Sequence, residues 1–210
     1  MTKKTKNSSP RRDKIIDIAS TIFWKKGYSG ASMRDIAKAC KCKPANIYNF
    51  FESKEEILFE FLFTQNMRLF EMIKHFEDDR TTKPSEQLRE FIHIHIKHVL
   101  SYQKTSRFLF DTGLEKLSKS NREKVIGFRD LYDRILTGII QRGIDAKEFS
   151  DMDAKLAARY IASMITRTII WYSSKGPLSL EDIAEFIYHF TMNGLKMRRN
   201  VKRVKTQQKK

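Results

Sequence analysis

The sequence is poor in cysteine and in long apolar runs. Its 210 residues include only two cysteines, Cys40 and Cys42. A single intervening residue does not suit a structural disulfide, so reduced thiols of a cytoplasmic protein are the simpler interpretation. No run approaches the roughly 18 to 20 apolar residues of a membrane span, and no apolar segment follows the basic N-terminus to make an export signal. These absences predict a cytoplasmic protein that has no membrane partner.

Proline is scarce too, and strand-like alternation is almost absent. The four prolines fall between periodic segments or at the start of one. Phe91–Val99 comes closest to alternation, but it lies inside a longer helical pattern. Apolar residues at three- and four-residue steps predict helices over about 11–26, 33–40, 44–51, 53–76, 86–102, 105–116, 121–142, 152–172 and 180–197. The predicted fold class is therefore all-α.

Local signals mark where several of these helices begin and end. Gly27 is expected to stop the first helix, and Pro44 suits the first position of the third. A serine followed three residues later by an acidic residue predicts a capped helix start. Four such pairs fall at predicted helix starts, namely Ser32 with Asp35, Ser53 with Glu56, Ser120 with Glu123, and Ser179 with Asp182.

The net charge of +16 is concentrated at the two ends of the chain. Residues 1–54 hold 13 Lys or Arg against 4 acidic residues, and residues 196–210 hold 8 Lys or Arg and no acidic residue. The segment between them is nearly neutral. Basic segments of this kind predict a polyanionic partner, either nucleic acid or an anionic membrane surface, although a basic tail can also serve only for solubility. We divide the chain into 1–54, 55–197 and a basic tail, 198–210.

Three short helices joined by tight connections precede the long helix at 53–76, which is the arrangement of a helix-turn-helix unit attached to a helical bundle. In the third helix Ile47 and Phe51 are expected to face inward. Asn side chains can read adenine edges, Tyr can bond phosphate oxygens, and helix N-termini offer backbone N–H groups to phosphates. The predicted DNA-binding residues are Ser32, Arg34, Lys43, Pro44, Ala45, Asn46, Tyr48, Asn49 and Lys54.

Residues 27–58, GYSGASMRDIAKACKCKPANIYNFFESKEEIL, resemble the DNA-binding signature of the TetR family of transcriptional repressors. The resemblance implies about nine helices, ligand control of DNA binding, and a homodimer formed through the last two long helices, 152–172 and 180–197. A two-fold dimer requires a near-palindromic operator. The family usually has glycine where this chain has Lys41 and a small hydroxyl residue where it has Lys43, so we expect a strained and more basic turn.

Two later segments, Phe128–Phe149 and Trp171–Ala184, more distantly resemble TetR-type regulators of lipid metabolism that respond to acyl-CoA thioesters. An acyl chain needs an apolar channel, and CoA phosphates need Arg or Lys at its mouth. The competing effector is a hydrophobic drug or metabolite. Arg167 lies in an apolar helix, where it contacts an anionic ligand, forms a salt bridge to a nearby acidic residue or lies at an exposed edge. The candidate effector-binding residues are Arg107, Phe110, Phe128, Arg129, Tyr132, Met164, Arg167 and Trp171.

The chain has no pattern of catalytic residues and no phosphate-binding glycine loop, so we expect neither an enzyme nor a bound cofactor. Of His93, His95 and His98, only the last two share a helix face. Two histidines without a nearby carboxylate or thiolate fit a pocket lining better than a metal site.

The sequence thus predicts a homodimeric repressor released from operator DNA by a small hydrophobic or acyl-CoA effector. The alternative is a scaffold that binds DNA or a membrane surface without sequence preference.

Overall fold

The computed structural model describes residues 10–101 and 113–196, and within these ranges every regular element is a helix. The all-α prediction is confirmed. The elements are α1 (Pro10–Gly30), α2 (Met33–Ala39), α3 (Pro44–Tyr48), α4 (Lys54–Ile73), the 3-10 turn η1 (Lys74–Glu77), α5 (Pro84–Ser101), the 3-10 turn η2 (Leu114–Lys116), α7 (Lys119–Asp145), α8 (Ala154–Trp171) and α9 (Leu180–Leu195). Most of the helix predicted over 105–116 lies outside the described residues.

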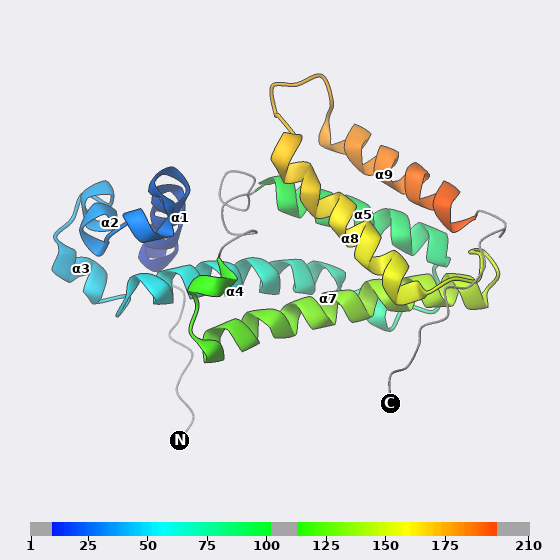
Figure 1. Ribbon diagram of the computed structural model, residues 1–210, viewed down its shortest axis with the longest axis horizontal. Coiled ribbons are helices and arrows are strands. Elements are labelled where there is room, and N and C mark those ends of the chain that lie inside the picture. Colours follow the sequence, from blue (N-terminus) through cyan, green and yellow to red (C-terminus); the bar gives the residue numbers. More distant parts are fainter. Residues whose placement is uncertain (1–9, 102–112, 197–210) are drawn as a thin grey trace, which may run out of the picture.

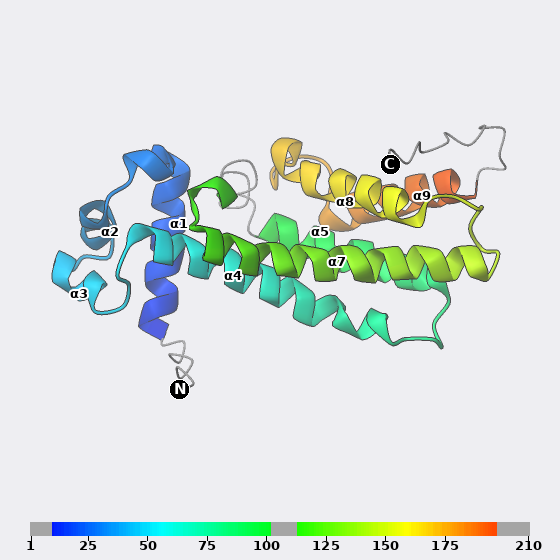
Figure 2. The same ribbon diagram turned by 60° about the horizontal axis from the view of Figure 1, so that its bottom comes forward.

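The helices form a small head and a longer body (Figure 1). Helices α1–α3 gather at one end, and α4 runs from them into the body alongside α7. Helix α5 packs against α4, α7, α8 and α9, α8 also packs against α7, and the turned view in Figure 2 places α8 and α9 farthest from α4. We call α1–α3 together with the first turn of α4 the reading head. Helix α4 is thus the covalent connection between the reading head and the body.

The core of the reading head extends beyond the three short helices. Ile47 and Phe51 are buried, as predicted, together with residues of α1, α2 and α4. Leu117 and Val125 belong to the same core, although they lie just before and inside α7. The boundary that we predicted at residue 54 therefore separates segments that pack together, because the start of α7 completes the core of the head.

The body has a separate core made by α5, α7, α8 and α9 together with the end of α4. Its packing depends on one glycine in α7, since a Cβ atom added to Gly143 would lie 2.2 Å from the Phe149 ring. Next to it the Arg142 guanidinium donates to the Phe76 carbonyl at 2.9 Å and to Gln87 Oε1 at 2.7 Å. These bonds give the Gln87 side-chain oxygen and the Arg142 Nη2 atom their partners.

Two of the four predicted capping boxes are complete. In Ser32–Asp35 and in Ser179–Asp182 the serine hydroxyl accepts the third backbone N–H and the carboxylate accepts the serine N–H. Ser53 accepts from the Glu56 N–H, so the first half of that box is present. Since α4 begins at Lys54 with this cap, the start of the connecting helix is fixed by its own sequence.

Two of the predicted start and stop signals act differently in the structure. Helix α7 begins at Lys119 with Ser118 as its cap, so the predicted cap at Ser120 is wrong. Ser118 is favoured because its hydroxyl caps Asn121 while its own N–H donates to a carboxylate of α4, Glu55. Gly27 does interrupt the first helix, with a φ of 71°, but helical turns resume and continue to Gly30.

Candidate nucleic-acid interface and ligand cavity

A buried arginine holds the third helix in place. Arg12 of α1 is 8% exposed, and its Nη1 atom donates to the Phe50 carbonyl at 2.6 Å. Its Nη2 atom lies 3.0 Å from the Glu60 carboxylate, and the guanidinium covers the Phe51 ring at 4.2 Å. A buried charge that is paired and hydrogen-bonded ties three elements together. The short α3 is therefore positioned by tertiary contacts, as a recognition helix requires.

Helix α3 presents one accessible face. Ile47 is fully buried on the inner side, whereas Tyr48 is 53% exposed. The helix ends at Tyr48, three residues before the predicted end, and Asn49 is its C-cap. Seven of the nine predicted DNA-binding residues are exposed and Asn46 is partly buried; the exposed ones are Ser32, Arg34, Lys43, Pro44, Ala45, Tyr48 and Asn49.

The turn between α2 and α3 contains a left-handed residue. Lys41 has a φ of 54°, a conformation that glycine adopts without steric cost and other residues rarely adopt. The turn is closed by backbone bonds from Lys41 N–H to the Lys38 carbonyl and from Cys42 N–H to the Ala37 carbonyl. Lysine at a glycine-type position keeps the turn and adds an exposed cation next to α3.

Lys54 differs from the other predicted DNA-binding residues, because its ammonium group points into the reading head. The Nζ atom donates to the carbonyls of Tyr28 and Ala31 at 2.6 and 2.8 Å and lies 4.3 Å from the Tyr28 ring centre. Burial lowers the pKa of this lysine. The contacts tie the connection between α1 and α2 to the start of α4, so Lys54 holds the two parts of the head together.

The next residue, Glu55, connects α4 to the start of α7. Its Oε1 atom accepts from the Ser118 N–H and from the Asn121 side-chain amide, both at 2.9 Å. The hydrogen bond from the Ser118 backbone is the main cause of the lowered pKa of Glu55. Lys54 and Glu55 therefore join the reading head to α7 through two neighbouring side chains.

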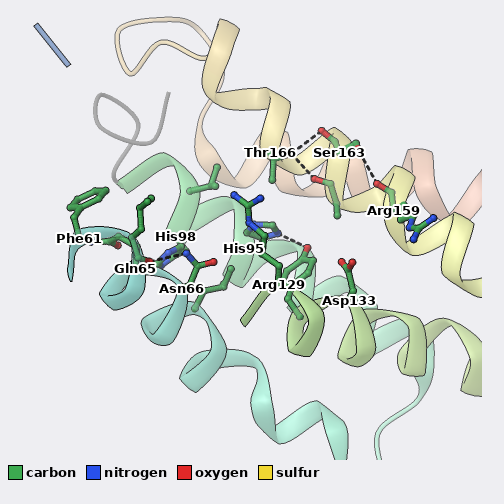
Figure 3. Close-up of a pocket in the computed structure, with 15 residues that line it drawn as sticks. Phe61, Gln65, Asn66, His95, His98, Arg129, Asp133, Arg159, Ser163 and Thr166 are labelled. Atoms are coloured by element: carbon green, nitrogen blue, oxygen red, sulfur yellow. Dashed lines mark hydrogen bonds between the residues drawn. The ribbon is translucent and has the colours of Figure 1, made fainter. Parts of the chain in front are cut away.

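A cavity of about 480 Å³ lies in the body between α4, α5, α7 and α8 (Figure 3). This volume falls within the range of roughly 300 to 1,000 Å³ that is typical of small-molecule sites. The lining combines apolar residues of α4 and α5 with polar residues from all four helices; it comprises Phe61, Leu62, Gln65, Asn66, Leu69, His95, His98, Val99, Arg129, Tyr132, Asp133, Arg159, Ala162, Ser163 and Thr166.

Both histidines of the cavity are neutral. His95 is 4% exposed and shares a 2.7 Å hydrogen bond, through Nδ1, with the Tyr132 hydroxyl. Burial, together with nearby His98, lowers the pKa of His95 to about 3, and burial with the Arg68 charge lowers the pKa of His98 to about 4. Burial also raises the pKa of Tyr132 well above its ordinary value. This part of the wall therefore offers neutral hydrogen-bonding groups at pH 7.

Three charged side chains line the other part of the cavity, with one more positive charge than negative. Arg129 and Asp133 belong to α7 and Arg159 belongs to α8. Burial is the main cause of the lowered pKa of Arg129 and of the raised pKa of Asp133. Because the histidines are uncharged, the net positive charge of the lining favours an anionic group on a ligand.

The structure brings only some of the predicted effector-binding residues to this cavity. Arg129 and Tyr132 line it, whereas Phe128 packs against Phe63 of α4 with ring centres 5.0 Å apart and is not part of the lining. Arg107 and Phe110 lie outside the described residues. Met164, Arg167 and Trp171 line a separate groove between α8 and α9.

The α4 residues of the lining were not predicted from the sequence, and the histidines of α5 were predicted only as a general pocket lining. His95 and His98 do share the cavity-facing side of α5. His93 faces α9 instead and lies 2.6 Å from the Glu185 carboxylate. Within residues 10–101 and 113–196, no three His, Cys, Asp or Glu side chains are grouped so that they could hold a metal ion.

Helices α8 and α9 carry most of the large apolar side chains that the body exposes. We call this the α8/α9 surface; its exposed members are Leu156, Tyr160, Ile170, Trp171, Leu178, Phe186 and Phe190. The last two are 71% and 60% exposed, and their rings stack with centres 6.3 Å apart. Trp171, Leu178, Phe186 and Phe190 line one groove, and large apolar side chains exposed together in this way are typical of interaction sites. None of the described helices combines the length and the apolar character that crossing a membrane requires.

The fold and these two sites define a DNA-binding regulator that carries a ligand cavity. The family model "Bacterial regulatory proteins, tetR family" matches residues 15–61. The model "Tetracyclin repressor-like, C-terminal domain" matches residues 81–195, more than half of the chain. The chain belongs to the TetR family of transcriptional regulators. It is a ligand-responsive DNA-binding regulator and not an enzyme.

Individual relatives match along nearly the whole chain. The HTH-type transcriptional repressor KstR2 of Rhodococcus jostii is 29% identical over 199 residues, which cover 91% of this chain and 94% of that protein. The fatty acid metabolism regulator protein of Bacillus subtilis is 28% identical over 195 residues, covering 90% and 98%. The crystal structure of AibR in complex with isovaleryl coenzyme A and operator DNA is similar in fold, with a TM-score of 0.75, 23% identity and coverage of 86% and 97%.

Proposed function

We propose that this protein is a homodimeric repressor that leaves a near-palindromic operator when an acyl-CoA thioester binds its cavity. One observation carries the proposal: the cavity is lined by α4 and α7, the same two helices whose N-terminal ends pack into the core of the reading head. The net positive lining suits a ligand with an anionic group. The names of two relatives add support, since one concerns fatty acid metabolism and the AibR structure contains isovaleryl coenzyme A.

In this proposal the accessible face of α3 reads the major groove. Asn46, Tyr48 and Asn49 contact bases or sugars, and Lys43 contacts phosphate. The N-terminus of α2, with Ser32 as cap and Arg34 exposed, contacts the flanking backbone. We no longer propose that Lys54 contacts phosphate, because its ammonium group is hydrogen-bonded to two carbonyls of the reading head.

The proposed dimer forms through the α8/α9 surface. Its exposed phenylalanines and tryptophan are the residue types that dimer interfaces bury. A second copy placed there by a two-fold axis would hold two reading heads at a fixed spacing. The two heads would then bind the two halves of the operator together.

A test of this proposal starts with DNA from the region upstream of the protein's own gene. We expect specific binding, measured by fluorescence anisotropy, that acyl-CoA thioesters abolish. Tyr48→Ala is expected to weaken binding by roughly tenfold to a hundredfold on this site alone. Lys43→Ala is expected to weaken binding to all sequences and to reduce the salt slope by about 0.9. Equal affinity for unrelated DNA would favour the sequence-independent scaffold instead.

We further propose that Glu55 transmits the effector signal. Ligand binding that moves α7 would also move Ser118 and Asn121, which are hydrogen-bonded to Glu55. Glu55 would pass this movement to the first turn of α4, where the neighbouring Lys54 contacts the rest of the reading head. Such a transmission requires the effector to prefer one of two states of the protein.

Glu55→Ala is therefore expected to uncouple the two sites. Effector affinity and operator affinity should each stay within about threefold of the unmodified protein, while the effector-induced loss of operator affinity should shrink several-fold from the roughly 5- to 150-fold typical of allosteric coupling. Titration calorimetry and anisotropy measure these quantities. Glu115→Ala, which changes an exposed glutamate on the neighbouring turn, is the control and should respond normally. Unchanged release in Glu55→Ala would exclude this route.

A further inference from the structure

The cavity is more polar than a saturated chain requires. Hydrogen-bonding groups from all four helices line it, and the apolar members, such as Phe61, Leu62 and Leu69, come mainly from α4. A plain alkyl group that filled this space would displace water from those polar groups and leave them without partners. The polar groups of the lining therefore indicate which functional groups the effector carries, in addition to its size.

Two of the hydroxyl groups in the lining are already occupied by their own helix. Ser163 donates to the Arg159 carbonyl at 2.7 Å, and Thr166 donates to the Ala162 carbonyl at 2.9 Å. These side chains cover the α8 wall without needing a ligand. The unused hydrogen-bonding capacity of the wall must be sought on α4, α5 and α7.

His95 and Tyr132 have this unused capacity. Among the described residues, each side chain forms one hydrogen bond, which is the bond between them. If the Tyr132 hydroxyl donates to Nδ1, then His95 Nε2 carries a proton and the tyrosine oxygen can still accept. If Nδ1 donates, then the hydroxyl proton is unused and Nε2 can accept. Because the imidazole is neutral, either tautomer offers the cavity one donor and one acceptor.

A third polar group on the wall is an acceptor that receives no hydrogen bond. The Oε1 atom of Gln65 is buried and has no hydrogen-bond partner among the described residues. Gln65 extends from α4 and lies beside His98 of α5 (Figure 3). A carbonyl oxygen on a ligand can accept but cannot donate, so the thioester group alone cannot satisfy these acceptors. A hydroxyl group can do both.

We infer that the effector carries a hydroxyl group on its acyl part, read by the His95–Tyr132 pair, and that a saturated acyl group of the same length is a poor effector. This inference rests on the proposed function, since it names the ligand class of the same cavity. The charged residues Arg129 and Arg159 then serve the anionic group of the ligand, and the apolar residues of α4 cover the carbon chain.

The test is titration calorimetry of the intact dimer with matched ligands of eight carbons. The thioesters are octanoyl-CoA, 3-oxooctanoyl-CoA, 3-hydroxyoctanoyl-CoA and 8-hydroxyoctanoyl-CoA, and the four free acids form a second set. We expect at least one hydroxy compound to bind roughly tenfold to a hundredfold more tightly than the saturated compound, with the oxo compound between them. Equal or tighter binding of the saturated compound overturns the inference.

Variants of single tyrosines test which residue causes the preference for the hydroxy compound. Tyr132→Phe removes only the hydroxyl and should reduce the preference for the hydroxy compound to about threefold or less, while the saturated compound keeps its affinity. Tyr188→Phe makes the same change on α9, outside the cavity, and should keep the full preference. Equal weakening of both ligands by Tyr132→Phe would mean that Tyr132 only supports the cavity, and it overturns the assignment to this pair.

The two sets of ligands separate the inference from the proposed function. If only the free acids bind and the hydroxy acid is preferred, the acyl-CoA proposal fails and the hydroxyl inference stands. If thioesters bind and release operator DNA with no preference for a hydroxyl, the proposed function stands and the inference fails. Binding of no member of either set overturns both.

Discussion

Gly143→Ala is expected to destabilise the body by about 3 kcal/mol, even though alanine favours helices over glycine by roughly 1 kcal/mol. The added Cβ would lie 2.2 and 2.3 Å from two carbon atoms of the Phe149 ring. That ring is 4% exposed and belongs to the core of the body, so it has no free space to enter. The Phe149 N–H also donates to the Gly143 carbonyl at 3.0 Å, which keeps the two residues together.

Urea unfolding followed by circular dichroism measures this loss, at one fixed protein concentration because a dimer unfolds in a concentration-dependent way. Gly127→Ala is the matched control, since it lies in the same helix and its added Cβ would meet nothing within 4 Å apart from the local helix backbone and the adjoining residues. It should stabilise the protein by up to about 1 kcal/mol. Phe149→Leu in the Gly143→Ala background should recover part of the loss. A Gly143→Ala protein as stable as the unmodified one would contradict the packing described above.

Phe186→Glu combined with Phe190→Glu is expected to convert the dimer to monomers and to weaken operator binding by roughly a hundredfold or more. The two rings are the most exposed phenylalanines of the α8/α9 surface and stack on each other. Glutamates there would place four like charges at a two-fold interface. A monomer binds one half-site at a time and loses the avidity of two linked heads.

Sedimentation and anisotropy measure the two parts of this prediction. Met72→Glu is the control, because Met72 is an exposed apolar residue of α4, outside the α8/α9 surface, with 41% exposure. It should leave both the dimer and the operator affinity intact. If the double variant remains a dimer with full operator affinity, the two copies associate through another surface.

Features that depend on neighbouring residues were predictable from the sequence. The capping boxes at Ser32 and Ser179 formed as expected, because each needs only residues three positions apart. The inward direction of Ile47 and Phe51 followed from helical spacing in the same way. The left-handed conformation of Lys41 was predictable as well, because the turn imposes a positive φ on whatever residue occupies the position that is usually glycine.

The face of α8 that meets the cavity could not be predicted. Arg159, Ala162, Ser163 and Thr166 form one stripe at helical spacing, whereas Met164 and its neighbours form another stripe on the side of the groove. Both stripes contain apolar and cationic residues, so the sequence pattern is consistent with either orientation. Rotation of α8 about its axis is fixed by its packing on α5 and α7.

By itself, the sequence determined that the protein is all-helical, that it carries a helix-turn-helix and which family it belongs to, because these features depend on local spacing and on a short signature. Only the tertiary structure decided what Lys54, His95 and Tyr132 do. Lys54 binds carbonyls 23 and 26 residues away, and His95 meets Tyr132 from another helix. Such contacts are set by how the helices pack against each other, which no single segment of the chain specifies.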